Sequence, residues 1–402
     1  MKRGRRPRVA FLRGSYLNAF ESQYLELLLD EYDVTAIHAG YQRFDVEAVG
    51  LPRRRVHCLD FLDGLVPHDP FGGRLPNPLK RLGFEEVMIG LRAALAEFDV
   101  VHTAEPSFFF SWQAAKLRRE LGFELVTTQC EVVPHCHQGR RGLARRASFV
   151  RERTDAFHAR SERARQALIT EGASPERVHV VGHGVDLARF HPGDRDPEVA
   201  RRAGIENEAF VVLFVGRLVW TKGIFALADA AALLLRDPSF RALKPVFVLV
   251  GSGPERARLE RRLELLALAD HFRLLGGRPY AEMPALHRLA DLFVLPSVPS
   301  RTILEQFGIA LVEAMATGTP VIGTHCGAID EVVGEAGVLV QPNDALRLAE
   351  AIRALAFDGD RSARLGRAGL ERARSKFSRE EIARQLSAIY RAALERRSNG
   401  EA

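Results

Sequence analysis

The chain has 402 residues, more than a single hydrophobic core usually accommodates, so two domains are expected. Hydrophobic residues make up 47% and charged residues 27%, which is ordinary for a soluble enzyme, and no apolar run reaches the roughly 18–20 residues of a membrane-spanning helix. The net charge of +6 fits an anionic donor, an anionic membrane surface or a nucleic acid, and does not decide among them.

The cysteines and the first residues bear on the compartment. The four cysteines, at positions 58, 130, 136 and 326, are few and scattered, so a disulfide framework is not expected and a reducing compartment fits. The basic head of the N-terminus is followed by an apolar run, residues 9–12, that is too short for a signal-peptide core. We therefore expect a cytoplasmic protein that is not exported.

Short apolar runs alternate with longer amphipathic stretches along the whole chain. The buried strands expected in the first half are residues 9–12, 100–102, 124–128, 157–159 and 179–181. Those expected in the second half are 211–215, 246–250, 272–274, 292–295, 321–322 and 338–340, with helices at 223–235, 255–268, 283–289 and 345–354. This alternation predicts an α/β protein with parallel sheets covered by helices on both faces.

A polar, turn-rich segment at residues 191–197 predicts a domain boundary. We expect an N-terminal domain at 1–190 and a C-terminal domain at 197–377. Residues 378–396 form one more predicted helix, which begins with a capping box at Ser378 and carries a single apolar stripe.

The block at 296–322 combines acidic residues with a predicted helix start. Glu305 precedes a helix that begins near Gly308, at the carboxyl end of a strand, where open α/β sheets bind ligands. The backbone N–H groups of Phe307, Gly308 and Ile309 can point at an anion or at hydroxyls. Glu313, on the helix, can accept hydrogen bonds from a vicinal diol such as ribose. Alternatively, Glu305 only favours the helix dipole and Glu313 is a solvated helix residue.

A second block, residues 215–223, predicts a strand, a glycine turn and a helix start. Gly216 forms the turn, and Arg217 and Lys222 bring two cations to one strand end, which suits a diphosphate. The alternative is a solvated loop that carries two surface cations.

Together these blocks resemble glycosyltransferase family 4. Glu305 and Glu313 match the Glu-x7-Glu signature, with Phe-Gly, Ala-Met-Ala and Gly-x-Pro in register. The resemblance implies that Glu305 contacts the donor sugar, that Glu313 contacts the ribose, and that Arg217 and Lys222 hold the donor phosphates and stabilise the leaving group. It further implies that the backbone near Arg278 reads the base.

The resemblance covers roughly residues 99–395 and is strongest at 210–345. It implies the GT-B fold, two facing Rossmann-like domains with parallel sheets and a C-terminal helix that crosses back to the N-terminal domain. It also implies a retaining transferase that uses a UDP- or GDP-sugar as co-substrate, with no cofactor and no essential metal. The N-terminal domain would bind the acceptor, a glycan or a lipid-linked molecule, in the synthesis of glycans, glycolipids or cell-envelope polysaccharides.

The N-terminal half matches the family less well. Gly14, in the loop after the first strand, can allow close approach of the donor diphosphate, or is an ordinary turn glycine. His102 resembles a histidine at a strand end that faces the acceptor, although a histidine there is more often structural. The family's donor-sugar histidine is absent from segment 127–131, where Glu131 is either a carboxylate that stabilises an oxocarbenium-like centre or a structural acid.

Three other patterns carry weaker alternatives. Cys130 with the run 135–137 suggests a zinc site, but adjacent residues of an extended chain point in opposite directions. Asp194 and Asp196 match an Asp-x-Asp metal motif but lie in the predicted linker, so we expect no metal there. The Arg-rich segment 140–153 is a candidate for peripheral contact with the inner face of a membrane, or is simply a solvated helix.

The sequence is therefore compatible with three functions. The first is a retaining glycosyltransferase, and the second is a catalytically degenerate GT-B protein that binds nucleotide sugar or partners another transferase. The third, a nucleic-acid-binding protein, rests on charge alone and no recognition motif supports it, so we expect no nucleic-acid partner.

Overall fold

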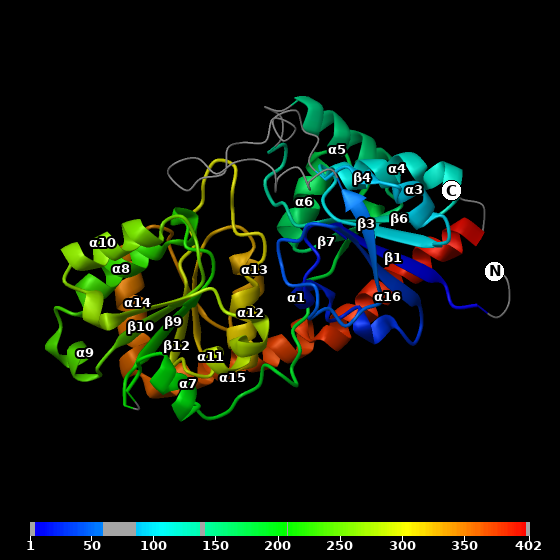
Figure 1. Cartoon of the computed structure of the whole chain (residues 1–402). Helices are drawn as coiled ribbons and strands as arrows, with labels where there is room; N and C mark the ends of the chain where they lie inside the picture. Colours follow the sequence, from blue (N-terminus) through cyan, green and yellow to red (C-terminus); the bar gives the residue numbers. More distant parts are fainter. Residues whose placement is uncertain (1–4, 59–85, 137–140, 207, 399–402) are drawn as a thin grey trace. The chain divides into compact units, whose positions relative to one another are not determined.

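The computed structural model describes residues 5–58, 86–136, 141–206 and 208–398. The chain divides into two compact units (Figure 1). Unit 1 comprises Met1–Gly184 and Arg379–Ala402, and unit 2 comprises Val185–Ser378. The first boundary thus lies between residues 184 and 185, before the predicted position at 190, and the linker at 191–197 belongs to unit 2.

Unit 1 is built on a sheet with the strand order β4-β3-β2-β1-β5-β6-β7-β8. All neighbouring pairs are parallel except β3 and β4, which are antiparallel. The strands are β1 (Arg8–Gly14), β2 (Asp33–Ala39), β3 (Arg53–Cys58), β4 (Met88–Ile89), β5 (Val100–Thr103), β6 (Glu124–Gln129), β7 (Ala156–Ala159) and β8 (Val178–Val180).

Side chains alternate between the two faces of this sheet, as the pleat of a strand requires. In β1, Val9 and Phe11 belong to one buried cluster, whereas Ala10 and Leu12 belong to another. Apolar side chains on both faces of a strand indicate a sheet covered on both sides, as predicted. The helices of unit 1 are α1 (Ala19–Ser22), η1 (Glu26–Leu28), α3 (Leu91–Leu95), α4 (Phe109–Leu121), α5 (Arg141–Arg153), α6 (Glu162–Thr170), η3 (Pro175–Arg177) and α16 (Arg379–Ser398).

The last helix, α16, is part of unit 1 although the preceding chain is part of unit 2. Its apolar stripe, Ile382, Leu386 and Ile389, is buried in the same cluster as Val9 and Phe11 of β1. The predicted helix at 378–396 therefore exists, and it completes the core of the N-terminal unit.

Unit 2 contains a parallel sheet with the strand order β11-β10-β9-β12-β13-β14. Its strands are β9 (Val211–Val215), β10 (Val246–Val250), β11 (Phe272–Gly276), β12 (Leu292–Leu295), β13 (Val321–Thr324) and β14 (Val338–Val340). Because β9 lies between β10 and β12, the loops that follow these three strands meet at one edge of the sheet.

Helices cover both faces of the unit 2 sheet. On one side α8 packs against α10 and α14, and on the other α12 packs against α11, α13 and α15 (Figure 1). The helices are α7 (Pro197–Arg202), η4 (Trp220–Lys222), α8 (Ile224–Leu234), α9 (Pro238–Ala242), α10 (Arg256–Leu265), η5 (Ala269–His271), η6 (Tyr280–Glu282), α11 (Met283–His287), α12 (Ile309–Ala316), α13 (Ile329–Val333), α14 (Ala345–Phe357) and α15 (Gly359–Phe377).

The structure has elements that the apolar pattern did not predict. Strands β2, β3 and β4 extend the unit 1 sheet, and β3 begins with three arginines that hide its strand character. Helix α15 is rich in arginine and contains Gly366, a residue that weakens helix predictions. A Cβ at Gly366 would lie 2.3 Å from the carbonyl oxygen of Gly318, so glycine there permits α15 to approach the chain just after α12.

Candidate functional site

The loop after β9 is fastened to the loop after β12. A Cβ at Gly223 would lie 1.8 Å from the carbonyl oxygen of Pro296, and the φ of Gly223 is +72°, so only glycine fits without a shift of the backbone. The N–H of Val298 donates to the carbonyl oxygen of Thr221 at 2.8 Å. The predicted cation loop is therefore held against the predicted acidic loop by backbone contacts.

The same loop is also fastened to the loop after β10. A Cβ at Gly251 would lie 1.9 Å from the carbonyl oxygen of Gly216, and one at Gly253 would lie 2.3 Å from that of Leu218. The N–H of Leu218 in turn donates to the carbonyl oxygen of Ser252 at 2.9 Å. The three loops form one tightly packed edge, and the glycines of both sequence blocks are explained by backbone approach.

Lys222 and Glu305, predicted separately, meet at this edge. The Nζ of Lys222 lies 2.5 Å from Oε2 of Glu305, and the hydroxyl of Ser297 donates to the same oxygen at 2.7 Å. The side chain of Glu305 is 8% exposed and that of Lys222 is 25% exposed. A Cβ at Gly327 would lie 1.9 Å from the carbonyl oxygen of Glu305, which also fixes the backbone at this acid.

Helix α12 begins where the sequence predicted. Gly308 adopts a left-handed φ of +86° at its N-cap, and Ile309 is its first residue. In the described part of the chain, no hydrogen bond from the backbone N–H of Gly308 or Ile309 was found. Phe307 as a whole residue is 7% exposed, and its ring packs edge-on against that of Phe377, so its side chain belongs to the core. The helix start thus presents free donors just after Glu305.

Glu313 lies inside the unit, not on a solvated helix face. Its side chain is 5% exposed, and its Oε2 lies 3.1 Å from Nε2 of His287, which is fully buried on α11. The sequence analysis missed His287 as a partner of this acid. The sequence analysis noted His287 only as part of the predicted helix at 283–289, and this gave no indication that its side chain contacts Glu313.

The two predicted arginines of this unit are exposed. Arg217 makes no ion pair with any residue that the structure describes, and it follows the turn at Gly216 directly. Arg278 lies beyond β11, with Nη1 3.9 Å from Oε2 of Glu282. Arg217 therefore has its charge available at the same loop as Lys222, whereas Arg278 belongs to a neighbouring loop.

A hollow of about 450 Å³ opens beside the Lys222 loop, and Lys222 and Glu305 are not among its lining residues. Trp220, which is 47% exposed, lines this hollow. The lining residues are Trp220, Gly223, Phe225, Ala226, Arg258, Val298 and Asn343.

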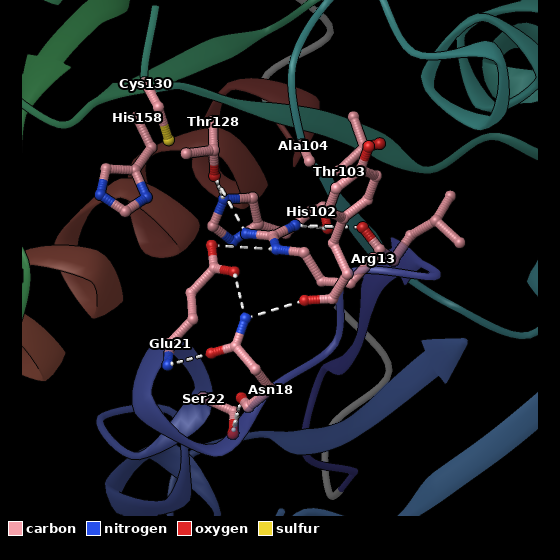
Figure 2. Close-up of polar contacts among 12 residues, drawn as sticks. Arg13, Asn18, Glu21, Ser22, His102, Thr103, Ala104, Thr128, Cys130 and His158 are labelled. Carbon is pink, nitrogen blue, oxygen red and sulfur yellow. Dashed lines mark hydrogen bonds and ion pairs between the residues drawn. The ribbon is translucent and has the colours of Figure 1, made fainter. Parts of the chain in front are cut away.

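In unit 1 the structure corrects the interpretation of His102. This residue is fully buried, its Nδ1 lies 2.6 Å from the hydroxyl of Tyr390 on α16, and its Nε2 lies 2.7 Å from the hydroxyl of Thr128 (Figure 2). Burial, together with the positive charge of Arg13, holds the pKa of His102 well below its usual value. With both ring nitrogens bonded to protein groups, His102 does not face an acceptor, and we assign it a structural role.

A buried ionic network surrounds His102. Figure 2 shows the side chain of Arg13 between Thr128 and Glu21, with Nη2 donating to the threonine hydroxyl at 3.1 Å. Oε1 of Glu21 accepts from Arg13 at 3.2 Å and from Arg160 at 2.7 Å. Burial alone would raise the pKa of Glu21, but the two arginines outweigh it and lower the pKa. The network joins β1 and α1 to the residue that follows β7, and it stabilises the core of unit 1.

The glycine after β1 is accounted for by packing. Gly14 is buried with a φ of +55°, and a Cβ there would lie 2.7 Å from the ring of Phe110. The described residues leave no open space beside Gly14, so its predicted contact with a donor diphosphate stays a prediction.

Two acids follow the neighbouring strands β5 and β6. Oε1 of Glu131 accepts from the backbone N–H groups of Val132 and Val133, both at 3.0 Å, as in a local turn. Glu105, which the sequence analysis did not select, accepts from the N–H of Cys130 at 2.6 Å. Burial and then the charge of Glu131 raise the pKa of Glu105 to about 7. A catalytic role for Glu131 stays a prediction.

The zinc alternative lies partly outside the described residues, because His137 is not among them. In the described ranges, no group of three or more His, Cys, Asp or Glu residues could hold a metal ion. Burial raises the pKa of the Cys136 thiol to about 12. Asp196 caps α7 by accepting from the N–H of Glu198 at 2.8 Å, which gives it a structural explanation.

The Arg-rich segment forms α5, and Arg140 lies outside the described residues. Arg146 stacks on Phe109 and donates to the carbonyl oxygen of Ser107, and Arg151 pairs with Glu171 at 2.9 Å. These arginines therefore contact unit 1 itself, and membrane contact by α5 stays a prediction. Nowhere in the described ranges does a helix combine the length and the apolar character needed to span a bilayer.

Comparisons with known proteins agree with the geometry in both halves. The profile of the family described as "Glycosyl transferases group 1" matches residues 196–372, and that of "Glycosyltransferase Family 4" matches residues 26–189. D-inositol 3-phosphate glycosyltransferase 1 from Catenulispora acidiphila is 35% identical over 367 residues, which cover 84% of this chain and 83% of that protein. A D-inositol 3-phosphate glycosyltransferase from Corynebacterium efficiens is 39% identical over 225 residues, 54% of this chain and 51% of the relative.

Solved structures share the fold. HepE from Anabaena in complex with UDP has a TM-score of 0.76 and 21% identity, over 96% of this chain and 100% of that one. Sucrose-phosphate synthase from Thermosynechococcus elongatus has a TM-score of 0.73 and 21% identity, over 97% of this chain and 100% of that one. The two Rossmann-like units of the prediction are thus confirmed, and the chain belongs to glycosyltransferase family 4 and is a glycosyltransferase with the GT-B fold.

Proposed function

We propose that this glycosyltransferase moves a sugar from a nucleotide-diphosphate sugar to an acceptor hydroxyl with retention of configuration. The observation that carries the proposal is the contact between Lys222 and Glu305 beside the free N–H groups at the start of α12. A cation, an acid and a helix N-terminus at the carboxyl edge of a parallel sheet are suited to a sugar diphosphate.

In this proposal each residue has one task at the donor. Arg217 and Lys222 bind the diphosphate, and the N–H groups of Gly308 and Ile309 donate to the phosphate or to sugar hydroxyls. Glu305 accepts hydrogen bonds from the sugar, and Glu313 from the ribose. Glu305 also forms an ion pair with Lys222. Support for a uridine nucleotide comes from HepE, whose structures contain UDP and UDP-glucose.

The chemical step follows from where charge develops. As the bond from the anomeric carbon to the leaving phosphate oxygen breaks, negative charge grows on the diphosphate, and the two cations stabilise it more strongly than they stabilise the bound donor. The acceptor hydroxyl attacks from the same face, and the departing phosphate oxygen takes its proton. Because Arg217 and Lys222 supply the charge that a divalent cation would supply, we propose that transfer needs no metal.

For the acceptor, the relatives narrow the sequence-based expectation of a glycan or lipid-linked molecule. The two relatives described above are named D-inositol 3-phosphate glycosyltransferases, and one of them aligns over 83% of its length. We propose a polyol acceptor of this kind, an inositol phosphate.

A donor screen followed by product analysis tests the proposal. Thermal unfolding with UDP-, GDP- and ADP-sugars is expected to show one base that raises the midpoint, because a ligand at 100 times its Kd adds about 2.7 kcal/mol of stability. With that donor, inositol 3-phosphate and a glycan acceptor are compared, with EDTA present and absent. NMR of the product should show the anomeric configuration of the donor. An inverted product would contradict retention, and donor binding without transfer or hydrolysis would favour the degenerate GT-B alternative.

A further inference from the structure

We propose that His287 is a positioning residue for the donor ribose: it fixes the carboxylate of Glu313 so that one oxygen faces inward and the other is left for the ribose hydroxyls. This inference rests on the donor site proposed above. It concerns specificity, because a fixed carboxylate distinguishes a ribonucleotide donor from its 2′-deoxy analogue.

The two oxygens of Glu313 have different surroundings. Oε2 lies 3.1 Å from Nε2 of His287. Oε1 has no hydrogen bond to any residue that the structure describes, and it is not completely shielded from solvent. The small exposed part of this side chain, 5%, therefore includes Oε1. One oxygen is anchored and the other can reach a ligand.

The ring of His287 is held in place by its neighbours. It is fully buried on α11, with its centroid 5.8 Å from that of Phe190 and 5.6 Å from that of Phe293. Two aromatic rings leave the imidazole little freedom to turn. The direction of its Nε2 is therefore set by packing, and through it the direction of the Glu313 carboxylate.

The other ring nitrogen, Nδ1, explains why a histidine at this position indicates a specific role. Nδ1 of His287 is buried and has no hydrogen-bond partner within the described residues. A buried polar atom without a partner costs stability, and Phe would fill the same apolar space without that cost. Because an ionised carboxylate only accepts hydrogen bonds, Nε2 of His287 is the donor in this contact. Among the described residues, the bond to Glu313 is the one hydrogen bond of the His287 side chain, and it offsets the cost of the unpaired Nδ1.

His287→Phe removes the donor N–H and keeps an aromatic ring, whereas His287→Gln keeps an N–H near the same place. The matched control is His271→Phe, since His271 precedes β11 at the opposite edge of the same sheet and its Nδ1 contacts the carbonyl oxygen of Pro245. Calorimetry measures the Kd of the nucleoside diphosphate selected by the donor screen, UDP or GDP, and of its 2′-deoxy analogue.

The wild type is expected to bind the ribonucleotide about 10-fold more tightly than the 2′-deoxy analogue, as loss of a hydrogen bond to a charged group implies. In His287→Phe this ratio should fall toward 1 through weaker binding of the ribonucleotide, while His287→Gln retains most of it and His271→Phe retains all of it. With saturating donor, kcat should change little, because the residue acts on binding.

A folded His287→Phe that keeps the wild-type ratio would overturn the inference and leave the donor site intact. A wild type that binds both nucleotides equally would instead refute the ribose role of Glu313, which belongs to the proposed function. If His287→Phe does not fold, ¹⁵N NMR of histidine-labelled wild type decides. The resonances of His287, assigned with the Gln variant, should shift on adding the ribonucleotide and much less with the 2′-deoxy analogue, and equal shifts would overturn the inference.

Discussion

The two units use their charged side chains differently. In unit 1, Glu21 lies between Arg13 and Arg160, and these ion pairs join separate segments of the unit. In unit 2, Glu305 contacts Lys222 at a loop edge where the lysine keeps 25% of its side chain exposed. The comparison teaches that a charged residue near a strand end points to function only when part of its charge remains available to a ligand.

The glycines differ in the same way. In unit 2, a Cβ at Gly223 would lie 1.8 Å from a backbone carbonyl oxygen, so glycine there lets two loops of the candidate site pack together. Gly14 in unit 1 faces the side chain of Phe110, which is a packing contact. Several glycines of unit 2 that face a backbone carbonyl lie at the candidate site, whereas Gly366, which faces the carbonyl oxygen of Gly318, permits helix packing.

The largest effect is expected from removing the cations of unit 2. Arg217→Ala and Lys222→Ala should each lower kcat about 100- to 1,000-fold, because both stabilise charge that develops on the leaving diphosphate. Steady-state kinetics of transfer measures this. The matched controls are Arg261→Ala and Lys244→Ala, which remove exposed cations of the same unit. Turnover near the wild-type value in Arg217→Ala or Lys222→Ala would show that these cations do not act on the leaving group, and the proposed difference between the units would be wrong.

The next effect concerns the glycines. Gly223→Ala should cost about 2–4 kcal/mol of the free energy of unfolding, since the Cβ meets a carbonyl oxygen and the φ is positive. Gly172→Ala in unit 1 has a φ of +95° but nothing within 4 Å of its Cβ, so only backbone strain of about 1–2 kcal/mol applies. Denaturant titration compares them, and equal costs would show that the backbone contact at Gly223 is not what requires glycine.

A smaller effect is expected from pH, and it should be confined to unit 1. Burial holds the pKa of His102 and His158 well below 6.5 and lowers that of His183 to about 3. The unfolded chain therefore takes up protons first, so this stability is complete above about pH 6.5 and is lost as the pH falls toward the folded-state values. At pH 5, a shift of this size corresponds to about 2 kcal/mol for His183.

The two tryptophans allow the pH effect to be assigned to a unit. Trp112 lies on α4 of unit 1 and Trp220 lies in unit 2, and the chain has no others. The raised pKa of Glu105 acts in the opposite direction between about pH 7 and pH 4.5, so in Trp220→Phe the unfolding midpoint reported by Trp112 should fall most steeply below about pH 5. In Trp112→Phe, the midpoint reported by Trp220 should fall less. An equal fall for both probes would contradict the confinement to unit 1.

The smallest effect tests the revised role of His102. Tyr390→Phe removes the hydroxyl 2.6 Å from Nδ1 of His102 and should cost about 1 kcal/mol of stability, with transfer activity close to that of the wild type. Thermal unfolding and kinetics on the same preparation check both statements. A large loss of turnover without loss of stability would restore a functional role for His102.

The sequence predicted more of unit 2 than of unit 1, for physical reasons. Glu305, Lys222 and the helix start at Gly308 could be found because a strand end, a turn glycine and a helix start leave local signals at fixed spacing. His287 could not, because its bond to Glu313 spans 26 residues and depends on tertiary packing. The fold class followed from the strand–helix alternation, whereas β3 was hidden by its arginines.

The prediction for His102, which is wrong, and the prediction for Gly14, which is still open, share one weakness. The predictions for His102 and Gly14 used their position after a strand, and position alone does not reveal whether Tyr390 or Phe110 fills the space beside them. Both partners are distant in sequence, one of them on the last helix. Burial of this kind becomes visible only when the tertiary contacts are known.

Hydrogen exchange with and without the nucleotide selected by the donor screen tests the central claim most directly, because it locates the donor on the chain. Peptides that contain residues 216–223 and 305–313 should exchange more slowly in the complex, including the amides of Gly308 and Ile309, while residues 236–245 at the opposite edge of the same sheet should not change. Slower exchange elsewhere, with both of these segments unaffected, would contradict a donor site at the carboxyl edge of the unit 2 sheet.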